Sequence, residues 1–323
     1  MTTMALQVFS PAVEERVAFA VREGLGGAPK RLPPWLFYDE AGSRLFDEIT
    51  ERPEYYLTRT ERAILAEHAG SMVARAAQGK RLRIVELGAG SADKTRLLLA
   101  AAVALQGRVV YEPVDVSASA LQMARERIER EIAGVTVAPQ VTDYTHGLEL
   151  AETDERKLVL YIGSSVGNFE PYEAECLLKM VRTTLRSGDG LLLGTDLVKD
   201  ESILLPAYDD AGGVTAAFNL NLLERLNREL DADFDLESFE HRVVWNGAKS
   251  RIEMHLLSRV AQEVCFRGLD FAVRFRENES IHTENSYKYR MGQPEEMLAK
   301  AGFTPAGTWT DKRNWFAVSL GRV

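Results

Sequence analysis

The chain has 323 residues, more than most single domains contain, and its 46% hydrophobic residues are enough for a large core. The formal net charge of −9 argues against a nucleic-acid partner, because phosphate binding requires clustered basic residues. Two distant cysteines, Cys176 and Cys265, lack histidine partners at ligand spacing, which excludes a disulfide framework, predicts no metal site and favours the cytoplasm.

Residues 1–20 are expected to be neither a signal peptide nor a membrane span, because charges at 14–16 come before any long apolar run. A helix is predicted over 58–78, with Thr58 or Thr60 as its N-cap. Strands then alternate with helices, which predicts a parallel sheet covered on both faces. The expected strands are 82–85, 109–116, 135–141, 158–162 and 191–194. The expected helices are 93–105, 118–132 and 172–185, and Pro171 is expected to be the N1 residue of the last helix.

The alternation stops after Asp196 and resumes near residue 286. A polar helix over 216–230 and strand-like runs at 252–258 and 263–275 indicate an inserted domain between these points. A helix at 294–301 and a strand at 315–320 then close the sheet with a terminal hairpin. We therefore predict an α/β fold of the class I methyltransferase type, a Rossmann-like parallel sheet, with a smaller α+β domain. The predicted methyltransferase domain is 58–197 and 286–323, and the substrate-recognition domain is 1–57 and 198–285.

The loop after the first strand, residues 86–91, has the form of a nucleotide-cofactor loop. Gly88 and Gly90 permit a tight turn and a close approach of the backbone to a ligand. Asp93 stands where a dinucleotide-binding loop has a third small residue, and its carboxylate would repel a pyrophosphate. A cationic cofactor without phosphate fits better, so we predict S-adenosyl-L-methionine (SAM).

Other candidate cofactor residues follow strands at the carboxyl edge of the sheet, where doubly wound sheets bind ligands. Asp115 can accept two hydrogen bonds from ribose hydroxyls. Asp143 can accept from the adenine amino group with Tyr144 beside it, and Gly163 follows the fourth strand. A tight turn or a helix cap is the alternative for any one of them, but four such loops in this order favour a cofactor site.

Several segments resemble the histidine-specific Nα-methyltransferases of ergothioneine biosynthesis, and together they span nearly the whole chain. They are WLFYD at 35–39, GSRLFDEIT at 42–50, PEYY at 53–56, TRTE at 58–61, ELGAGS at 86–91 with Lys94-Thr95, GSSVGNF at 163–169 and ENSYKY at 284–289. One departure is Leu57, where the family usually has proline, and it should alter a turn more than the site.

The resemblance implies trimethylation of the α-amine of L-histidine to hercynine, with three molecules of SAM. It also implies a small-molecule substrate. Apart from the resemblance, we expect no membrane partner and a monomeric protein. On the cofactor it places Gly88, Lys94, Asp115, Asp143 and Tyr144. On or near the amino acid it places Tyr38, Phe46, Tyr55, Gly163, Asn168, Tyr208, Met254, Glu284 and Ser286, and we assign the catalytic roles to Tyr38 and Asn168.

A histidine pocket must read two ring nitrogens. Glu284 and Ser286 would point to the same side of an extended segment, so one can accept from an N–H while the other serves the second nitrogen. A solvated polar loop is the alternative for this pair. Asn168 can donate to the carboxylate and accept from the amine, or it caps the helix after Pro171.

Aromatic residues suit an amine that becomes a quaternary ammonium, because their faces attract such cations. Tyr38, Phe46 and Tyr55 are the candidates, and core packing is the alternative for each. Tyr208 is expected to reach the carboxylate, and a surface or packing role is its alternative. Met254 is expected to border the ring or to fill the core, and Tyr56 to serve packing.

Methyl transfer is an in-line attack by a free amine, so the main tasks are alignment and exclusion of water. No histidine or lysine stands out as a general base, and Tyr38 is a candidate for orienting the amine. A methyltransferase for another aromatic amino acid or amine is the alternative enzyme. A non-catalytic cofactor-binding or scaffold protein on the same fold is the alternative class.

Overall fold

The computed structural model describes residues 11–90 and 92–323, so Ser91 of the glycine loop and residues 1–10 lie outside the described part. The chain forms two compact units. Unit 1 comprises Met1–Glu51, Leu205–Trp245 and Glu253–Glu284, and unit 2 comprises Arg52–Leu204, Asn246–Ile252 and Asn285–Val323. Within the described ranges no helix combines the length and apolar character that a membrane span requires.

Among the described residues, unit 2 contains an eight-stranded sheet with the order β13-β14-β7-β6-β2-β3-β4, and β5 pairs with β3. The strands from β7 to β4 are parallel, whereas β14 is antiparallel to β7 and to β13. The predicted parallel sheet with a terminal hairpin is therefore confirmed. The bounds are β2 Leu82–Leu87, β3 Val109–Asp115, β4 Val135–Val137, β5 Gln140–Val141, β6 Arg156–Tyr161, β7 Gly190–Asp196, β13 Thr304–Thr310 and β14 Phe316–Arg322.

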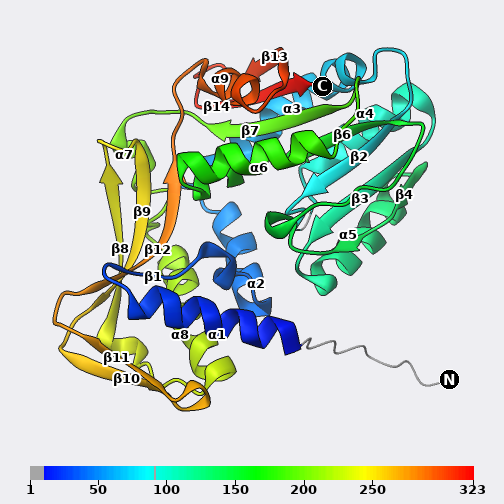
Figure 1. Ribbon diagram of the computed structural model, residues 1–323. Coiled ribbons are helices and arrows are strands. Elements are labelled where there is room, and N and C mark those ends of the chain that lie inside the picture. The colour runs from blue at the N-terminus through cyan, green and yellow to red at the C-terminus, as the bar shows by residue number, and fades with distance from the viewer. Residues whose placement is uncertain (1–10, 91) are drawn as a thin grey trace. The chain divides into compact units, whose positions relative to one another are not determined.

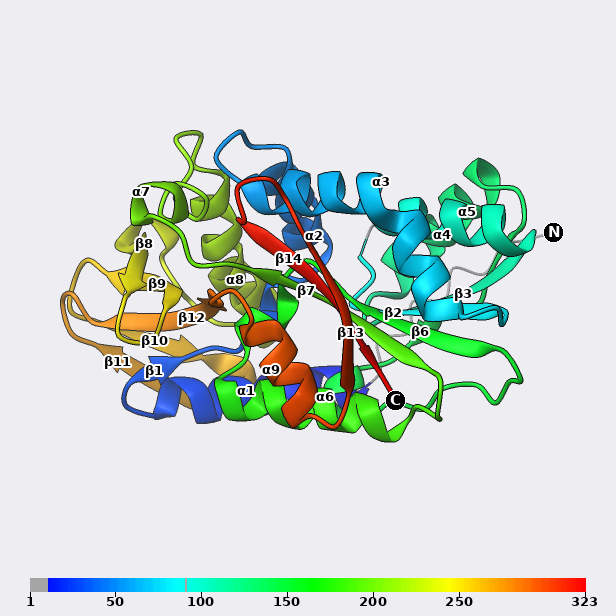
Figure 2. The ribbon, with the colours of Figure 1, turned by 90° about the horizontal axis from the view of Figure 1, so that it is seen from above.

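Helices cover both faces of this sheet, as Figures 1 and 2 show. On β6, Leu158 and Leu160 belong to one apolar core, while Val159 and Tyr161 belong to the other. This alternation explains why the strand is a continuous apolar run, since both of its faces are buried. The first core includes α3 (Tyr56–Ala77), α4 (Thr95–Gln106) and α5 (Ala118–Glu131), and the second includes α6 (Pro171–Thr183) and α9 (Gln293–Lys300).

Two predictions in unit 2 need correction. Helix α3 begins at Tyr56 with Tyr55 as its N-cap, so Thr60 lies inside the helix, where its hydroxyl donates to the Tyr56 carbonyl at 2.8 Å. The run at 135–141 is two short strands, β4 and β5, because Pro139 has no N–H for a sheet ladder. Pro171 is confirmed as the first residue of α6.

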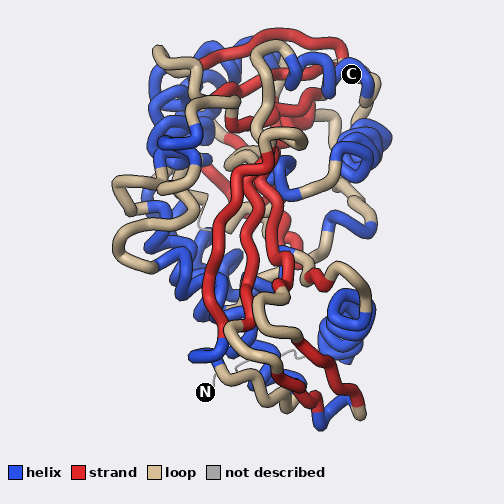
Figure 3. The backbone as a smooth tube through the Cα atoms, turned by 90° about the vertical axis from the view of Figure 1, so that its left-hand side faces the viewer, coloured by secondary structure: helices blue, strands red, loops and turns tan. Residues whose placement is uncertain are grey.

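Unit 1 packs helix α2 (Glu40–Thr50) against helix α8 (Val214–Leu230). A second sheet, with most of its residues in this unit, has the order β1-β12-β9-β8 and faces the viewer in Figure 3. The other elements of the unit are α1 (Pro11–Gly26), η1 (Pro34–Phe37), η4 (Leu236–Ser238) and η5 (Arg267–Leu269). The strands of the second sheet are β1 Lys30–Arg31, β8 Phe239–Asn246, β9 Arg251–Ser258 and β12 Ser280–Tyr287.

The run at 263–275, predicted as one strand, is a hairpin. Strand β10 (Gln262–Phe266) turns through η5 into β11 (Phe271–Phe275), with Val264 opposite Val273. Gly268 lies in the turn, where a side chain would approach the Leu230 carbonyl oxygen to 3.0 Å. The short elements of unit 2 are η2 (Tyr144–His146), η3 (Ser165–Asn168) and α7 (Glu201–Leu204). The assignment of these parts to cofactor and substrate domains stays a prediction.

Candidate active site

The glycine loop turns at the carboxyl end of β2. Gly88 and Gly90 have φ of +67° and +48°, a backbone region that favours glycine. A side chain at Gly88 would also meet the Tyr144 hydroxyl at 3.4 Å. Asp115, at the end of β3, accepts from Gly90 N–H at 3.1 Å and from Ser117 N–H at 3.0 Å. The structure thus gathers three of the predicted cofactor positions, Gly88, Asp115 and Tyr144, around one loop.

The Asp143-Tyr144 pair follows β5. The Asp143 carboxylate accepts from the Thr145 N–H at 2.9 Å and from its hydroxyl at 2.6 Å, so it caps η2 as the alternative reading proposed. Its contact with adenine stays a prediction. The Tyr144 ring lies edge-on to Tyr161, with centroids 6.0 Å apart. Burial raises the pKa of Tyr144 to about 12, so this phenol is neutral at physiological pH.

Lys94 is held by Glu61, a residue that the sequence analysis did not select. The fully buried Glu61 carboxylate forms an ion pair with the Lys94 ammonium and accepts from Gly163 N–H at 3.0 Å. Gly163 has φ of +81°, and a side chain there would lie 3.2 Å from Lys94 Nζ. Glu61 therefore ties α3 to the loops after β2 and β6. Glu61 stands within the TRTE segment at 58–61, which was the sequence signal available for finding it.

Glu86, at the end of β2, is a second buried acid beside the loop. Its carboxyl group accepts from the Thr95 hydroxyl at 2.6 Å and from the Tyr111 hydroxyl. Burial raises the pKa of Glu86 to about 7, because two neutral hydroxyls only partly replace the water that a carboxylate loses. This acid anchors the strand to the first turn of α4 and to β3.

Within unit 2, the segment at 163–169 lies against Tyr287 at the end of β12. A side chain at Gly167 would lie 3.0 Å from the Tyr287 carbonyl oxygen, closer than an ordinary van der Waals contact, so this approach favours glycine. Asn168 ends η3, and the N-cap of α6 is Glu170, so the reading of Asn168 as that cap is wrong. Its contact with substrate stays a prediction.

A buried polar group at the end of β7, here called the Asp196 cluster, consists of Tyr56, Asp196, Lys199 and Lys288. Tyr56 is buried with its ring against Trp315, as its assignment to packing predicted, and its hydroxyl also donates to Asp196 Oδ2 at 2.6 Å. The Lys288 ammonium lies 2.8 Å from Asp196 Oδ2 and donates to Ser286 Oγ at 2.8 Å. Tyr56 and Lys288 stand within the PEYY and ENSYKY segments, which was the signal available for finding them.

Lys199 is the second ammonium of the cluster. Its Nζ lies 2.6 Å from Asp196 Oδ1 and 2.8 Å from the Tyr56 hydroxyl, and it also donates to the Leu197 carbonyl. Burial lowers the pKa of Lys199 to about 8 despite this pairing. Asp196 therefore holds two lysines, of which only Lys288 contacts a predicted substrate residue.

In unit 1, two of the predicted aromatic residues lie in one cluster. The rings of Tyr38 and Phe46 are 5.8 Å apart, and each lies 6.0 Å from Phe218 on α8. Asp39 caps α2 through Gly42 N–H at 2.7 Å and accepts from Asn221 at 2.9 Å, which fixes the segment to α8. The third aromatic, Tyr55, belongs to unit 2, where it precedes α3 and is buried.

The remaining substrate candidates are buried or lie in a strand. Tyr208 is 6% exposed, so it is no surface residue, and its carbonyl lies 2.9 Å from His241 Nε2. Met254 is fully buried on β9, and its carbonyl accepts from the Thr283 hydroxyl at 3.0 Å. Glu284 and Ser286 both lie in β12, and Ser286 is 5% exposed. The alternative of a solvated loop is therefore wrong for this segment.

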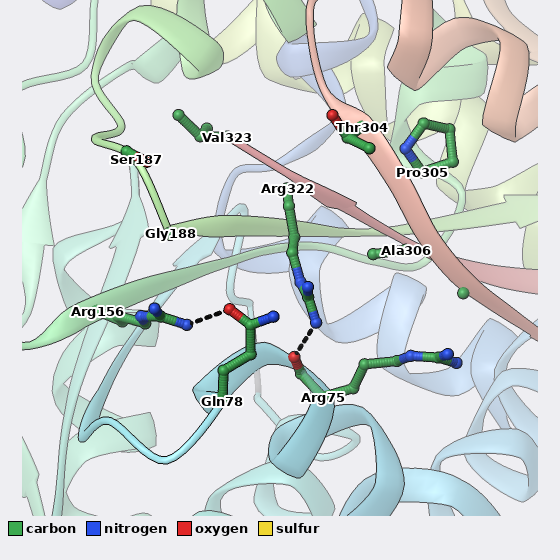
Figure 4. Close-up of a pocket in the computed structure, with 11 residues that line it drawn as sticks. Arg75, Gln78, Arg156, Ser187, Gly188, Thr304, Pro305, Ala306, Arg322 and Val323 are labelled. Atoms are coloured by element: carbon green, nitrogen blue, oxygen red, sulfur yellow. Dashed lines mark hydrogen bonds between the residues drawn. The ribbon is translucent and has the colours of Figure 1, made fainter.

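A cavity of about 750 Å³ in unit 2 is drawn in Figure 4. It lies beside the starts of β6, β7 and β13, at the sheet edge opposite the glycine loop. Arg156 donates to the Gln78 side chain at 2.6 Å, and Arg322 donates to the Arg75 carbonyl at 2.6 Å. Because ligands of doubly wound sheets bind at the carboxyl ends of parallel strands, this cavity is not the candidate site.

Among the described residues, donor atoms of Glu253, His255 and His282 lie within 4.8 Å of one another. The two imidazole rings stack with centroids 4.9 Å apart, and His255 Nε2 lies 3.3 Å from a Glu253 oxygen. Ring stacking and this hydrogen bond account for the group without an ion. The expectation of no metal site stays a prediction.

The strand order, the helices on both faces and the glycine loop after β2 define a Rossmann-like methyltransferase of class I. Residues 17–323 match the family described as "Histidine-specific methyltransferase, SAM-dependent", and the chain belongs to this family.

Relatives of known name span the chain. The histidine N-alpha-methyltransferase of Mycolicibacterium smegmatis is 43% identical over 98% of both chains. That of Mycobacterium tuberculosis is 43% identical over 93% of this chain and 92% of its own. Ergothioneine biosynthesis protein 1 of Neurospora crassa is 29% identical over 87% of this chain and 32% of its own length.

Proposed function

We propose that the protein transfers methyl groups from SAM to the α-amine of L-histidine and, after three transfers, yields hercynine for ergothioneine biosynthesis. The observation that carries the proposal is 43% identity with the M. smegmatis histidine N-alpha-methyltransferase over 98% of both chains. The family match over residues 17–323 supports it independently of any single relative. We further propose that the protein acts as a cytoplasmic monomer without a nucleic-acid partner.

The residues around the glycine loop fit SAM. Gly88 and Gly90 adopt positive φ, so the backbone can turn closely around a ligand. Asp115 accepts one protein hydrogen bond at each carboxylate oxygen, and a carboxylate has further lone pairs for the two ribose hydroxyls. Lys94, Asp143 and Tyr144 complete the proposed cofactor set. Bound SAM would supply an electrophilic methyl group on a sulfonium.

For the substrate, the proposal assigns the imidazole to Glu284 and Ser286 and the carboxylate to Asn168 and Tyr208. Selectivity follows from burial, because a ligand without ring nitrogens would offer no hydrogen-bonding atom to the buried Ser286 hydroxyl. Met254 and Gly163 are proposed to shape the ring and amine ends.

The chemistry asks the protein to hold an unprotonated amine in line with the methyl carbon and to exclude water. Tyr38 is half-buried, and its hydroxyl is proposed to orient the amine, with Asn168 as the second contact of the amine. As the amine becomes a cation, the faces of Tyr38, Phe46 and Tyr55 would stabilise it. A firmly held ring and carboxylate would keep the mono- and dimethylated intermediates bound between transfers.

The test is incubation with methyl-labelled SAM and each of the twenty amino acids. We expect label in histidine alone, whereas transfer to another aromatic amino acid with histidine inert would establish the alternative enzyme. No transfer, and no SAM binding by calorimetry, would favour a non-catalytic protein of the same fold.

Glu284→Ala sharpens the substrate assignment. We expect it to raise the KM for histidine by about 10-fold or more, through loss of a half-buried carboxylate acceptor, while the Kd for SAM stays within about twofold. Glu284→Gln, which keeps one acceptor oxygen, is the matched control and should lose less. An equal loss of histidine and SAM binding would show that Glu284 does not read the ring.

A further inference from the structure

We infer that Lys288 is a positioning residue that orients the Ser286 hydroxyl toward the substrate imidazole and thereby selects a ring nitrogen with a free lone pair. The inference rests on the proposed function, because it assigns Ser286 to the ring. It adds Lys288, and the orientation of a hydroxyl by a fixed charge, to the proposed substrate site. The evidence comes from the Asp196 cluster, which lies entirely in unit 2.

The hydrogen bond between Lys288 and Ser286 has a fixed direction. The Lys288 ammonium lies 2.8 Å from Ser286 Oγ, and an ammonium can only donate. Ser286 Oγ must therefore accept from Lys288 with one lone pair. Its own hydrogen is directed away from Lys288, because two hydrogens cannot occupy the same contact. A hydroxyl that could otherwise serve as donor or acceptor is thus set to donate to a third group.

The fold also holds Lys288 in place. A buried ammonium is costly unless it is paired and hydrogen-bonded, and Asp196 Oδ2 lies 2.8 Å from Lys288 Nζ. Asp196 is fixed in turn, since its backbone N–H donates to Ser164 Oγ at 2.9 Å and its carbonyl accepts from Tyr289 N–H at 2.9 Å. The backbone N–H of Lys288 donates to the Ser250 carbonyl at 2.8 Å. Both ends of the contact are therefore immobilised by the fold.

The direction of the Ser286 hydroxyl limits which form of the substrate imidazole can bind. A neutral imidazole has one nitrogen with a lone pair and one N–H. With Ser286 set to donate, it serves the lone-pair nitrogen, which leaves the N–H for the Glu284 carboxylate. The nearby Lys288 charge also disfavours a positively charged imidazolium at this position. The device therefore selects a neutral imidazole in one tautomer.

The cluster provides its own matched control. Lys199 and Lys288 are both buried and bind the same Asp196 carboxylate, but Lys199 contacts the Tyr56 hydroxyl where Lys288 contacts Ser286. Lys288→Met leaves Asp196 with Lys199 and Tyr56, so the carboxylate is not stranded. Lys199→Met removes a comparable charge without touching Ser286.

The experiment measures the histidine KM, kcat and the SAM Kd for both variants, for Ser286→Ala, and for the Ser286→Ala/Lys288→Met double variant. We expect Lys288→Met to raise KM by about 10-fold, through loss of a charge-oriented hydrogen bond, with SAM Kd within about twofold. Lys199→Met should leave KM within about threefold. The KM effect of Lys288→Met should largely disappear when Ser286 is already alanine.

Two results would overturn the inference. Lys288→Met could raise KM as much with alanine at 286 as with serine, or Lys199→Met could raise KM as much as Lys288→Met. A KM for Ser286→Ala equal to that of the natural protein would instead remove Ser286 from the ring and reject that part of the proposed function. The two failures are therefore distinguishable.

An unaltered protein gives a second measurement if Lys288→Met fails to fold. A histidine analogue whose ring has an N–H but no lone-pair nitrogen, 3-(pyrrol-2-yl)alanine, should be a poor substrate by about 10-fold or more in kcat/KM. An analogue used as well as histidine would show that no hydroxyl donor reads the second nitrogen, and would overturn the inference.

Discussion

Two buried acids in unit 2 show how the same kind of group is treated differently. Glu86, at the end of β2, is hydrogen-bonded to the hydroxyls of Thr95 and Tyr111. Asp196, at the end of β7, pairs with the ammonium groups of Lys199 and Lys288. Burial is nearly complete for both. The two acids therefore differ in their partners. Burial raises the pKa of Glu86 to about 7, and its two hydroxyl partners offset only part of that rise. Asp196 instead forms ion pairs with two ammonium groups.

The difference matters for function. Glu86 holds a strand, a helix start and a second strand together beside the glycine loop, and it can do so as a neutral acid. The Asp196 cluster ties the end of β7 to the ENSYKY segment, where a fixed charge gives a hydroxyl its direction. A neutral acid supports a scaffold, and a charged one orients polar groups around it.

The largest expected effect concerns Asp196. Asp196→Asn leaves two buried ammonium groups without a counter-charge and should lower the free energy of unfolding by about 3–5 kcal/mol. Urea denaturation at pH 7 measures it. Glu40→Gln, which removes the exposed ion pair with Arg44, is the control and should cost less than about 1 kcal/mol. Similar losses in the two variants would show that the buried Asp196 cluster contributes no more to stability than an exposed ion pair.

The next effect is a pH dependence at Glu86. Its folded pKa of about 7 lies above the ordinary 4.5, so the folded state binds the proton more tightly than the unfolded state. Its stabilising contribution is therefore complete below about pH 4.5 and is lost as pH rises through 7. Glu86→Gln should remove this loss, which amounts to about 3 kcal/mol.

The measurement is the free energy of unfolding from pH 5 to pH 8 for both proteins. The two curves should diverge as the pH rises, with the glutamine variant relatively more stable at pH 8 than at pH 5. Parallel curves across this range would show that Glu86 ionises in the folded state as it does in water.

The smallest effect separates backbone strain from site geometry. Gly88→Ala and Gly107→Ala both place alanine at positive φ, +67° and +83°, and each should cost about 1–2 kcal/mol of stability. Only at Gly88 does the added carbon meet a side chain, the Tyr144 hydroxyl at 3.4 Å, whereas Gly107 faces open space. Calorimetry should therefore show weaker SAM binding for Gly88→Ala alone. Equal SAM affinities would place the cofactor away from this loop.

Most of the unit 2 sheet could be predicted from sequence, because each strand and helix carries its own apolar pattern over a few residues. The predictions were wrong where one local feature breaks that pattern, as at Pro139 and in the turn at Gly268. Strands β8 and β12 were not predicted, since their half-buried polar residues conceal any alternation.

Some residues of the candidate site were predictable from the sequence, and others were not. Gly88 and Asp115 follow strand ends, so their place was predictable from the order of elements. Glu61 and Asp196 were not selected, because the sequence does not show that Glu61 meets Lys94, 33 positions away, or that Asp196 meets Lys288, 92 positions away. An isolated polar residue in a sequence does not reveal which distant group it will meet.

A mass spectrum of the product formed from L-histidine and excess SAM tests the central claim most directly. We expect a histidine that carries three added methyl groups, with fragments that place all three on the α-nitrogen. Unmodified histidine, or methyl groups on the imidazole ring, would contradict it.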